Sequence, residues 1–142
     1  MPVRKAQAEW NGTLREGKGT MKMATGAYEG PYSFISRFEE GTGTNPEELI
    51  AAAHAGCFSM ALSGVLGGAG FEPKSVKTTA KVTIEKVGSG FSITSSHLST
   101  EADIPGIDEP TFQQHAASAK QNCPVSRALA GVEITLDAKL VA

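Results

Sequence analysis

The sequence predicts an α+β protein with antiparallel sheets, because strand-like and helix-like segments are grouped along it and do not alternate regularly. Its 142 residues fit one compact domain, residues 1–142, and 40% of them are hydrophobic, which is enough to build a core. Charged residues make up 20%, a composition that argues against a disordered chain.

The net charge and the composition of the first residues limit the partners and the cellular location that we expect for the protein. The net charge of −2 and the lack of a basic run argue against a nucleic-acid or membrane-surface partner. The first residues lack the apolar core of a secretory signal, and polar residues and glycines interrupt the apolar stretch 49–66, so we expect no membrane span. We therefore expect a cytoplasmic location, where stable structural disulfides are disfavoured.

The first forty residues are expected to form strands. Residues 7–14 surround Trp10 with polar residues, and glycines punctuate the turns that follow. Residues 32–38 alternate well enough to predict a strand, with Phe34 and Phe38 on one face and Arg37 on the other.

A long helix is predicted next, over residues 46–66. Asn45 suits its N-cap, Pro46 its first position, and Glu48 lies three residues after the cap, as in a capping box. The helix is expected to stop at Gly67 and Gly68. Its many small residues allow another helix to approach closely.

The rest of the chain shows clear strand alternation and proline-marked helix starts. The predicted elements are strands over 76–84 and 91–102 joined by a turn at 88–90, a helix from Asp108 or Pro110 to Asn122, a short helix from Pro124 to Ala130, and a strand over 132–140.

Cys57 is one of two cysteines in the chain. It lies about 16 Å into the long helix, too far for the helix dipole to lower its pKa, and its apolar neighbours would raise that pKa. A reactive Cys57 therefore needs a cation from elsewhere, and Arg37 is the best candidate. The alternative, a small buried core residue, carries equal weight from these observations.

Cys123 precedes Pro124 at the junction of two predicted helices. Since Pro124 suits the first turn of a new helix, Cys123 takes a position like an N-cap, where free amides stabilise a thiolate. A helix-junction residue without a chemical role is the alternative.

His54 precedes Cys57 by three residues and can share its helix face, as a base for the thiol or as half of a metal pair. Zinc needs three or four ligands, however, and the sequence has no C-x-x-C motif. It also lacks a phosphate loop, a dinucleotide fingerprint and a Gly-x-Ser-x-Gly elbow.

Three segments, 37–39, 43–62 and 123–126, together resemble the osmotically inducible protein C and organic hydroperoxide resistance family. The resemblance extends over nearly the whole chain. The histidine before Gly56 and Cys57, the valine at position 125 and the place of Arg37 just before the helix are similar to the osmotically inducible branch.

The resemblance implies a cysteine-based peroxidase without metal, haem or other cofactor. It implies that Cys57 is the peroxidatic cysteine, Cys123 the resolving cysteine, Arg37 the thiolate-activating cation and Glu47 its carboxylate partner. The fold it implies is an intertwined homodimer, with two long central helices backed by curved antiparallel sheets and active sites at the subunit interface.

Helix geometry favours such a dimer independently. Glu47 and Cys57 are ten residues apart on one predicted helix, or about 15 Å along its axis. If both belong to one active site, Glu47 must come from the partner subunit.

The expected reaction is reduction of organic hydroperoxides, and less efficiently hydrogen peroxide, by a Cys57 thiolate. It proceeds through a sulfenic acid and a Cys57–Cys123 disulfide that a dithiol, of the lipoyl type in relatives, reduces. Apolar walls for the substrate are expected from Ile35, Phe38, Phe58 and Met60.

Three other functions stay open from the sequence. A redox-sensing or ligand-binding stress protein would react at Cys57 without turnover. A structural stress protein would use both cysteines as core residues. Zinc binding is the third and has the least support.

Overall fold

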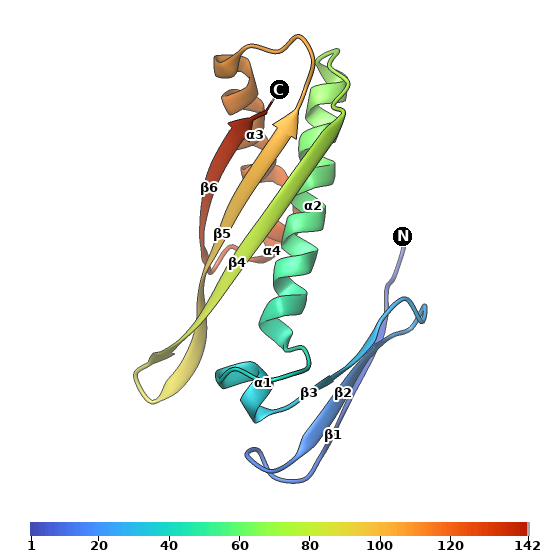
Figure 1. The fold of residues 1–142 in the computed structure, drawn as a ribbon, viewed down its shortest axis with the longest axis vertical. Helices are drawn as coiled ribbons and strands as arrows, with labels where there is room; N and C mark the ends of the chain where they lie inside the picture. The colour runs from blue at the N-terminus through green and yellow to red at the C-terminus, as the bar shows by residue number, and fades with distance from the viewer. Residues whose placement is uncertain (142) are drawn as a thin grey trace. The chain divides into compact units, whose positions relative to one another are not determined.

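The computed structural model describes residues 1–141, which build two compact units, Met1–Leu49 and the chain from Ile50 onward (Figure 1). The long helix α2, Pro46–Gly68, begins in the first unit and continues in the second. Helices and strands are both present and grouped along the chain, so the predicted α+β class is confirmed.

The first unit contains a three-stranded antiparallel sheet in the order β1-β2-β3. Its strands are β1 (Ala6–Asn11), β2 (Lys18–Met23) and β3 (Glu29–Tyr32). Gly19 pairs with Trp10 on one side and Tyr32 on the other, and the two rings lie 5.3 Å apart. A Cβ atom at Gly19 would meet both rings at 2.5–2.6 Å, so a side chain there would push them apart.

The predicted strand over 32–38 is wrong. β3 ends at Tyr32, and Phe34–Phe38 form the short helix α1. Ser33 caps it in a reciprocal capping box with Ser36, a local signal that outweighs the alternation. Phe34 and Phe38 also lie one helical turn apart, with ring centroids separated by 5.0 Å, so the same residues suit a helix.

The second unit contains a sheet of β4 (Ser75–Val87), β5 (Gly90–Asp103) and β6 (Glu133–Leu140), in that order. β4 and β5 form the expected hairpin, but β6 lies parallel to β5, so the prediction of purely antiparallel sheets is wrong here. Parallel neighbours need a long crossover, and the two helices between β5 and β6 provide it.

Those helices are α3, Glu109–Asn122, and α4, Pro124–Ala128. Asp108 caps α3 by accepting from the Thr111 amide, as its sequence position predicts. α4 begins at Pro124 as expected and ends two residues before the predicted Ala130.

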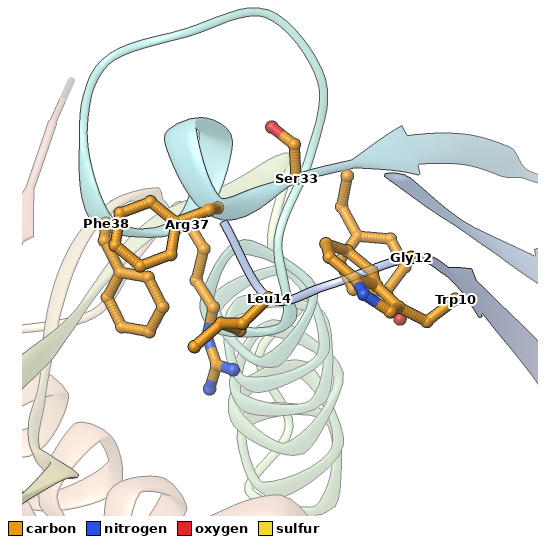
Figure 2. Close-up of a pocket in the computed structure, with 8 residues that line it drawn as sticks. Trp10, Gly12, Leu14, Ser33, Arg37 and Phe38 are labelled. Atoms are coloured by element: carbon orange, nitrogen blue, oxygen red, sulfur yellow. The ribbon is translucent and has the colours of Figure 1, made fainter. Parts of the chain in front are cut away.

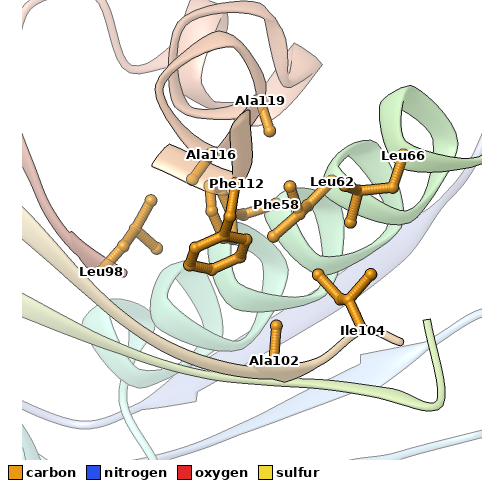
Figure 3. Close-up of a cluster of buried hydrophobic side chains, with 9 residues drawn as sticks. All are labelled: Phe58, Leu62, Leu66, Leu98, Ala102, Ile104, Phe112, Ala116 and Ala119. Atoms are coloured by element: carbon orange, nitrogen blue, oxygen red, sulfur yellow. The ribbon is translucent and has the colours of Figure 1, made fainter. Parts of the chain in front are cut away.

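The core of the second unit lies between α2, α3 and β5 (Figure 3). Phe58, Leu62 and Leu66 recur every fourth residue along α2 and are fully buried. They pack against one face of α3 and the buried side of β5, and the other core members are Leu98, Ala102, Ile104, Phe112, Ala116 and Ala119.

α2 continues through Gly67 and Gly68, past its predicted end. It stops where Gly70 takes a φ of +90° and donates its amide to the Gly67 carbonyl, while the Phe71 amide donates to the Leu66 carbonyl. These two bonds form a Schellman cap, which needs a left-handed residue at the position of Gly70. Gly67 and Gly68 are therefore helical residues.

α2 is also long and apolar enough to cross a membrane, by length and composition alone. The expectation that this stretch is too polar for a span is thus wrong on composition. The helix instead packs its fully buried side chains in the core of the second unit.

Replacing Leu62 with alanine should lower the free energy of unfolding by about 3 kcal/mol, because it leaves a cavity in this core. Urea unfolding followed by circular dichroism measures the change. Val87→Ala, at an exposed strand end, is the control and should change it by less than about 0.5 kcal/mol. Equal effects of the two variants would contradict the assignment of the core.

Candidate functional site

The two cysteines lie together in the second unit. Their sulfurs are 2.8 Å apart, and both thiols are free. Cys57 lies on α2 and is partly exposed, whereas Cys123 is fully buried. The two residues, 66 positions apart in the chain, are therefore within reach of each other without a change of fold.

Cys123 occupies the junction between α3 and α4. It is the C-cap of α3, through its amide bond to the Ala119 carbonyl, and the N-cap of α4. Its sulfur accepts from the Ser126 amide at 3.5 Å. The predicted N-cap-like setting of Cys123 is thus present, and it exists because Pro124 starts a new helix there.

The two thiols differ in acidity. Burial, and next the hydrogen bond with Cys123, raise the pKa of Cys57 above its ordinary value of 9.0, with a smaller opposing effect from the Val125 amide. Burial also acts to raise the pKa of Cys123, but the hydrogen bond with Cys57 and, next, those with the amide and side chain of Ser126 outweigh it and lower that pKa. Within the second unit, Cys123 is the more acidic thiol.

His54 is fully buried one turn before Phe58 on the inner side of α2. Its Nδ1 lies 2.7 Å from the Ser96 hydroxyl of β5, and its Nε2 lies 2.8 Å from the Ser126 hydroxyl of α4. Burial lowers the pKa of His54 below 6.5. Both ring nitrogens are thus engaged by serines, an arrangement that the two sequence hypotheses, a base for the thiol and a metal pair, do not include.

Arg37 and Glu47 form a bidentate ion pair in the first unit. Nε of Arg37 donates to Oε1 of Glu47 at 3.1 Å, and Nη2 donates to Oε2 at 3.0 Å. The carboxylate is nearly buried, and the arginine side chain stays 35% exposed. Among residues 1–141, Nη1 has no hydrogen-bond partner, so one edge of the guanidinium is available to a ligand.

Glu48 has a different task. Its amide donates to the Asn45 side chain at 2.7 Å, which is the predicted N-cap, and its carboxylate accepts from the Thr44 hydroxyl. The Asn45 amide group in turn donates to the Ser36 carbonyl, and the Ser36 hydroxyl donates to the Thr44 carbonyl. These bonds tie α1 to the start of α2 and hold Arg37 beside Glu47.

A largely apolar pocket of about 420 Å³ lies next to Arg37 in the first unit (Figure 2). Aromatic rings and Leu14 form most of its wall, and Arg37 contributes a positive charge to the lining. The lining residues are Trp10, Gly12, Leu14, Tyr32, Ser33, Phe34, Arg37 and Phe38. Such a site suits a molecule with an apolar body and a polar group.

The four residues predicted to form apolar walls for the substrate do not all lie in this pocket. Phe38 lines this pocket, but Phe58 is fully buried in the core of the second unit, so its predicted role as a wall is wrong. Ile35 and Met60 are 51% and 79% exposed. Over residues 1–141 the structure holds no group of three or more metal-ligating side chains.

The four predicted site residues therefore form two pairs, Arg37 with Glu47 and Cys57 with Cys123. Sequence reasoning missed the serines that bind His54. The signal available was spacing, since His54 lies four residues before Phe58 in the stripe that continues to Leu62. That spacing predicts a buried histidine, which needs polar partners.

Comparison with known proteins shows which family this chain resembles. Residues 39–137 match the model of the family described as OsmC-like protein. The chain is similar to Peroxiredoxin OsmC of Escherichia coli K12, with 53% identity over 138 residues and 96% of each chain covered. It is 35% identical to the organic hydroperoxide resistance protein of Xanthomonas axonopodis pv. citri, over 68% of this chain and 67% of that one.

Solved structures show the same fold. An organic hydroperoxide resistance protein from Elizabethkingia anophelis superposes with a TM-score of 0.76, 27% identity and 99% of each chain covered. The protein OhrB of Bacillus subtilis gives a TM-score of 0.72 and 26% identity, over 95% of this chain and 98% of that one.

The buried His54 predicts a pH dependence of stability. Because burial lowers its pKa in the folded protein, the unfolded chain binds this proton more readily. The free energy of unfolding should have its full value above about pH 6.5. As the pH falls from there toward the folded-state pKa of His54, this free energy should decrease by up to about 1.4 kcal/mol per pH unit.

Urea unfolding between about pH 7.5 and 5.5 measures this slope. His54→Gln should flatten it, and His115→Gln, on α3, is the matched control. A slope that is the same in the wild type and in His54→Gln would contradict the prediction.

Proposed function

The chain belongs to the OsmC-like family and is a thiol-dependent peroxidase, and we propose that Cys57 is the thiol that reacts with the peroxide. The observation that carries the proposal is the pair of free thiols 2.8 Å apart, of which only Cys57 is partly exposed. A peroxide reaches Cys57 first because Cys123 is fully buried.

The proposed cycle uses both thiols in turn. The Cys57 thiolate attacks one peroxide oxygen, the O–O bond breaks, and an alcohol or water leaves after taking up a proton. Cys57 becomes a sulfenic acid. The Cys123 sulfur then attacks the Cys57 sulfur, hydroxide leaves and is protonated to water, and a disulfide forms. A dithiol reduces that disulfide by exchange and is itself oxidised.

Arg37 is proposed to supply the cation that Cys57 needs. Burial raises the pKa of Cys57 within its own unit, so the thiolate must be stabilised by a charge from outside it. The guanidinium is always charged, and Glu47 holds it by two hydrogen bonds while Nη1 stays available. A lysine could not make this forked contact.

The functional form is proposed to be a homodimer with active sites at the subunit interface. Exposed small residues and the largely exposed Met60 form a stripe along α2, opposite its buried side. The stripe consists of Ala52, Ala53, Gly56, Met60, Ser63, Gly64 and Gly67. A second copy of the helix can pack on such a surface across a two-fold axis, and Arg37 of one chain then serves Cys57 of the other.

The proposed substrates are organic hydroperoxides in preference to hydrogen peroxide. The apolar pocket beside Arg37 suits the hydrocarbon part of such a molecule, which hydrogen peroxide lacks. The similarity to organic hydroperoxide resistance proteins supports the same class. We propose a lipoyl-type dithiol as the reductant and the cytoplasm, where dithiols are kept reduced, as the location.

Cys57→Ser should abolish turnover of an organic hydroperoxide in the presence of dithiol, since no thiol then meets the substrate. Cys123→Ser should consume about one equivalent of peroxide and stall at the sulfenic acid, because no partner thiol resolves it. Stopped-flow peroxide consumption and mass spectrometry of dimedone-trapped protein measure both. Turnover by Cys57→Ser would exclude Cys57, and normal cycling by Cys123→Ser would exclude Cys123 as the resolving thiol.

Mixed dimers test the shared site. Arg37→Ala and Cys57→Ala should each be inactive alone. Co-expressed with two different affinity tags, they should regain about a quarter of wild-type activity, because half the dimers are mixed and each holds one intact site. Isolated mixed dimers should show about half. Absence of recovery in isolated mixed dimers would show that Arg37 and Cys57 of the same chain act together.

A further inference from the structure

A continuous chain of hydrogen-bonding groups connects β5 to the second cysteine. It runs from the Ser96 hydroxyl through the His54 ring to the Ser126 hydroxyl, at 2.7 and 2.8 Å, and the Ser126 amide donates to the Cys123 sulfur at 3.5 Å. Ser96 and His54 are fully buried and Ser126 is 5% exposed, so water has little access to these groups.

The protons of this chain can be assigned by counting donors and acceptors. Burial lowers the pKa of His54, so the ring is neutral at pH 7 and has one N–H donor and one bare acceptor nitrogen. Among residues 1–141, Nδ1 of His54 is the only acceptor that bonds the Ser96 hydroxyl. If Nδ1 carried the proton, the hydroxyl proton of a fully buried serine would have no acceptor, which is a costly arrangement.

The opposite tautomer satisfies every group. Ser96 donates to a bare Nδ1, Nε2–H of His54 donates to the Ser126 oxygen, and the Ser126 hydroxyl proton is left to point at the Cys123 sulfur. We infer that His54 is a positioning residue, held by Ser96 as the Nε2–H tautomer, which aims the Ser126 hydroxyl at Cys123 and so stabilises the Cys123 thiolate.

Other contacts of Cys123 agree with this direction. The Ser126 amide donates to the same sulfur at 3.5 Å, so the residue that carries the hydroxyl is already bonded to Cys123 through its backbone. The hydrogen bond with Cys57 has the largest lowering effect on the pKa of Cys123, and the Ser126 contacts add to it, so that together they outweigh burial. Ser96 does not touch Cys123 and acts on it only through the imidazole.

The consequence for the cycle rests on the function proposed above. In resolution, the Cys123 thiolate attacks the sulfenic sulfur of Cys57, and the leaving hydroxide takes the proton that Cys123 gave up. In reduction, a dithiol thiolate attacks the partly exposed Cys57 sulfur, the Cys57–Cys123 bond breaks, and its electron pair leaves on Cys123. The sulfur with the lower pKa leaves faster, so the same hydroxyl favours both steps.

The tautomer can be observed directly in the reduced full-length protein. Nitrogen-15 spectra of histidine-labelled protein near pH 7.5, assigned with His54→Gln, distinguish a protonated ring nitrogen from a bare one. We expect a protonated Nε2 and a bare Nδ1. A protonated Nδ1 with a bare Nε2 would overturn the inference.

A second measurement tests the effect on the thiol. In a Cys57→Ala background, thiolate absorbance against pH reports Cys123 alone. Ser126→Ala should raise the pKa of Cys123 by about 1, because it removes a hydrogen bond to a charged sulfur. Ser96→Ala should raise it as well, although Ser96 lies beyond the imidazole, and Ser96→Thr should restore it.

Thr100→Val is the matched control. It removes a buried hydroxyl from the same strand, where Thr100 contacts Thr78 and the Lys77 carbonyl and has no contact with His54. It should leave the Cys123 pKa unchanged. Equal shifts from Thr100→Val and Ser96→Ala, or none from Ser126→Ala, would overturn the inference. These measurements use no peroxide, so they succeed or fail separately from the peroxidase assays.

Discussion

The burial of one stripe of α2 is the constraint on which the other features of the second unit depend. His54, Phe58, Leu62 and Leu66 recur every fourth residue, and all four side chains are fully buried. Because that stripe must face α3 and β5, the rotation of the helix is set, and Cys57 falls at its edge, partly exposed. The same rotation turns Met60 away from the core. The packing of α2 thus leaves Cys57 partly exposed to solvent and buries His54.

Hydrogen bonds to the two sulfurs affect their relative acidity more than burial does. Cys123 is the more buried thiol, and burial alone would make it the weaker acid. It nevertheless has the lowered pKa, because the hydrogen bond with Cys57 and, next, the contacts of Ser126 in the first turn of α4 outweigh its burial. Cys57, with more access to solvent, lacks a comparable set in its own unit. Of the two sulfurs in contact, that of Cys57 is therefore the more exposed and that of Cys123 the more acidic.

Much of this architecture could be predicted from local signals. Asn45, Asp108 and Pro124 mark helix starts that the structure contains, because capping is a contact between near neighbours in the sequence. The hairpin of β4 and β5 follows from its alternation and turn. Short segments were harder: residues 34–38 satisfy both a strand and a helix pattern, and a capping box decided between them.

Contacts between residues that are far apart in the chain could not be predicted from the sequence. The parallel pairing of β6 with β5 depends on how α3 and α4 cross the sheet, which no local pattern states. The bonds from Ser96 and Ser126 to His54 connect residues 42 and 72 positions apart. Their side chains looked like ordinary polar residues in a strand and a helix. Only the fold shows that they meet one buried imidazole.

The separation of the two cysteines in the chain has a thermodynamic meaning. A covalent bond between them would close a loop of 66 residues and remove conformational freedom from the unfolded chain. In a chain-entropy model such a crosslink stabilises the fold by roughly 4 kcal/mol, provided the folded state tolerates it without strain. Thiols already in contact meet that condition with little movement. Oxidation by the peroxide would then raise the free energy of unfolding while the peroxide is consumed, and reduction of the disulfide would lower it again.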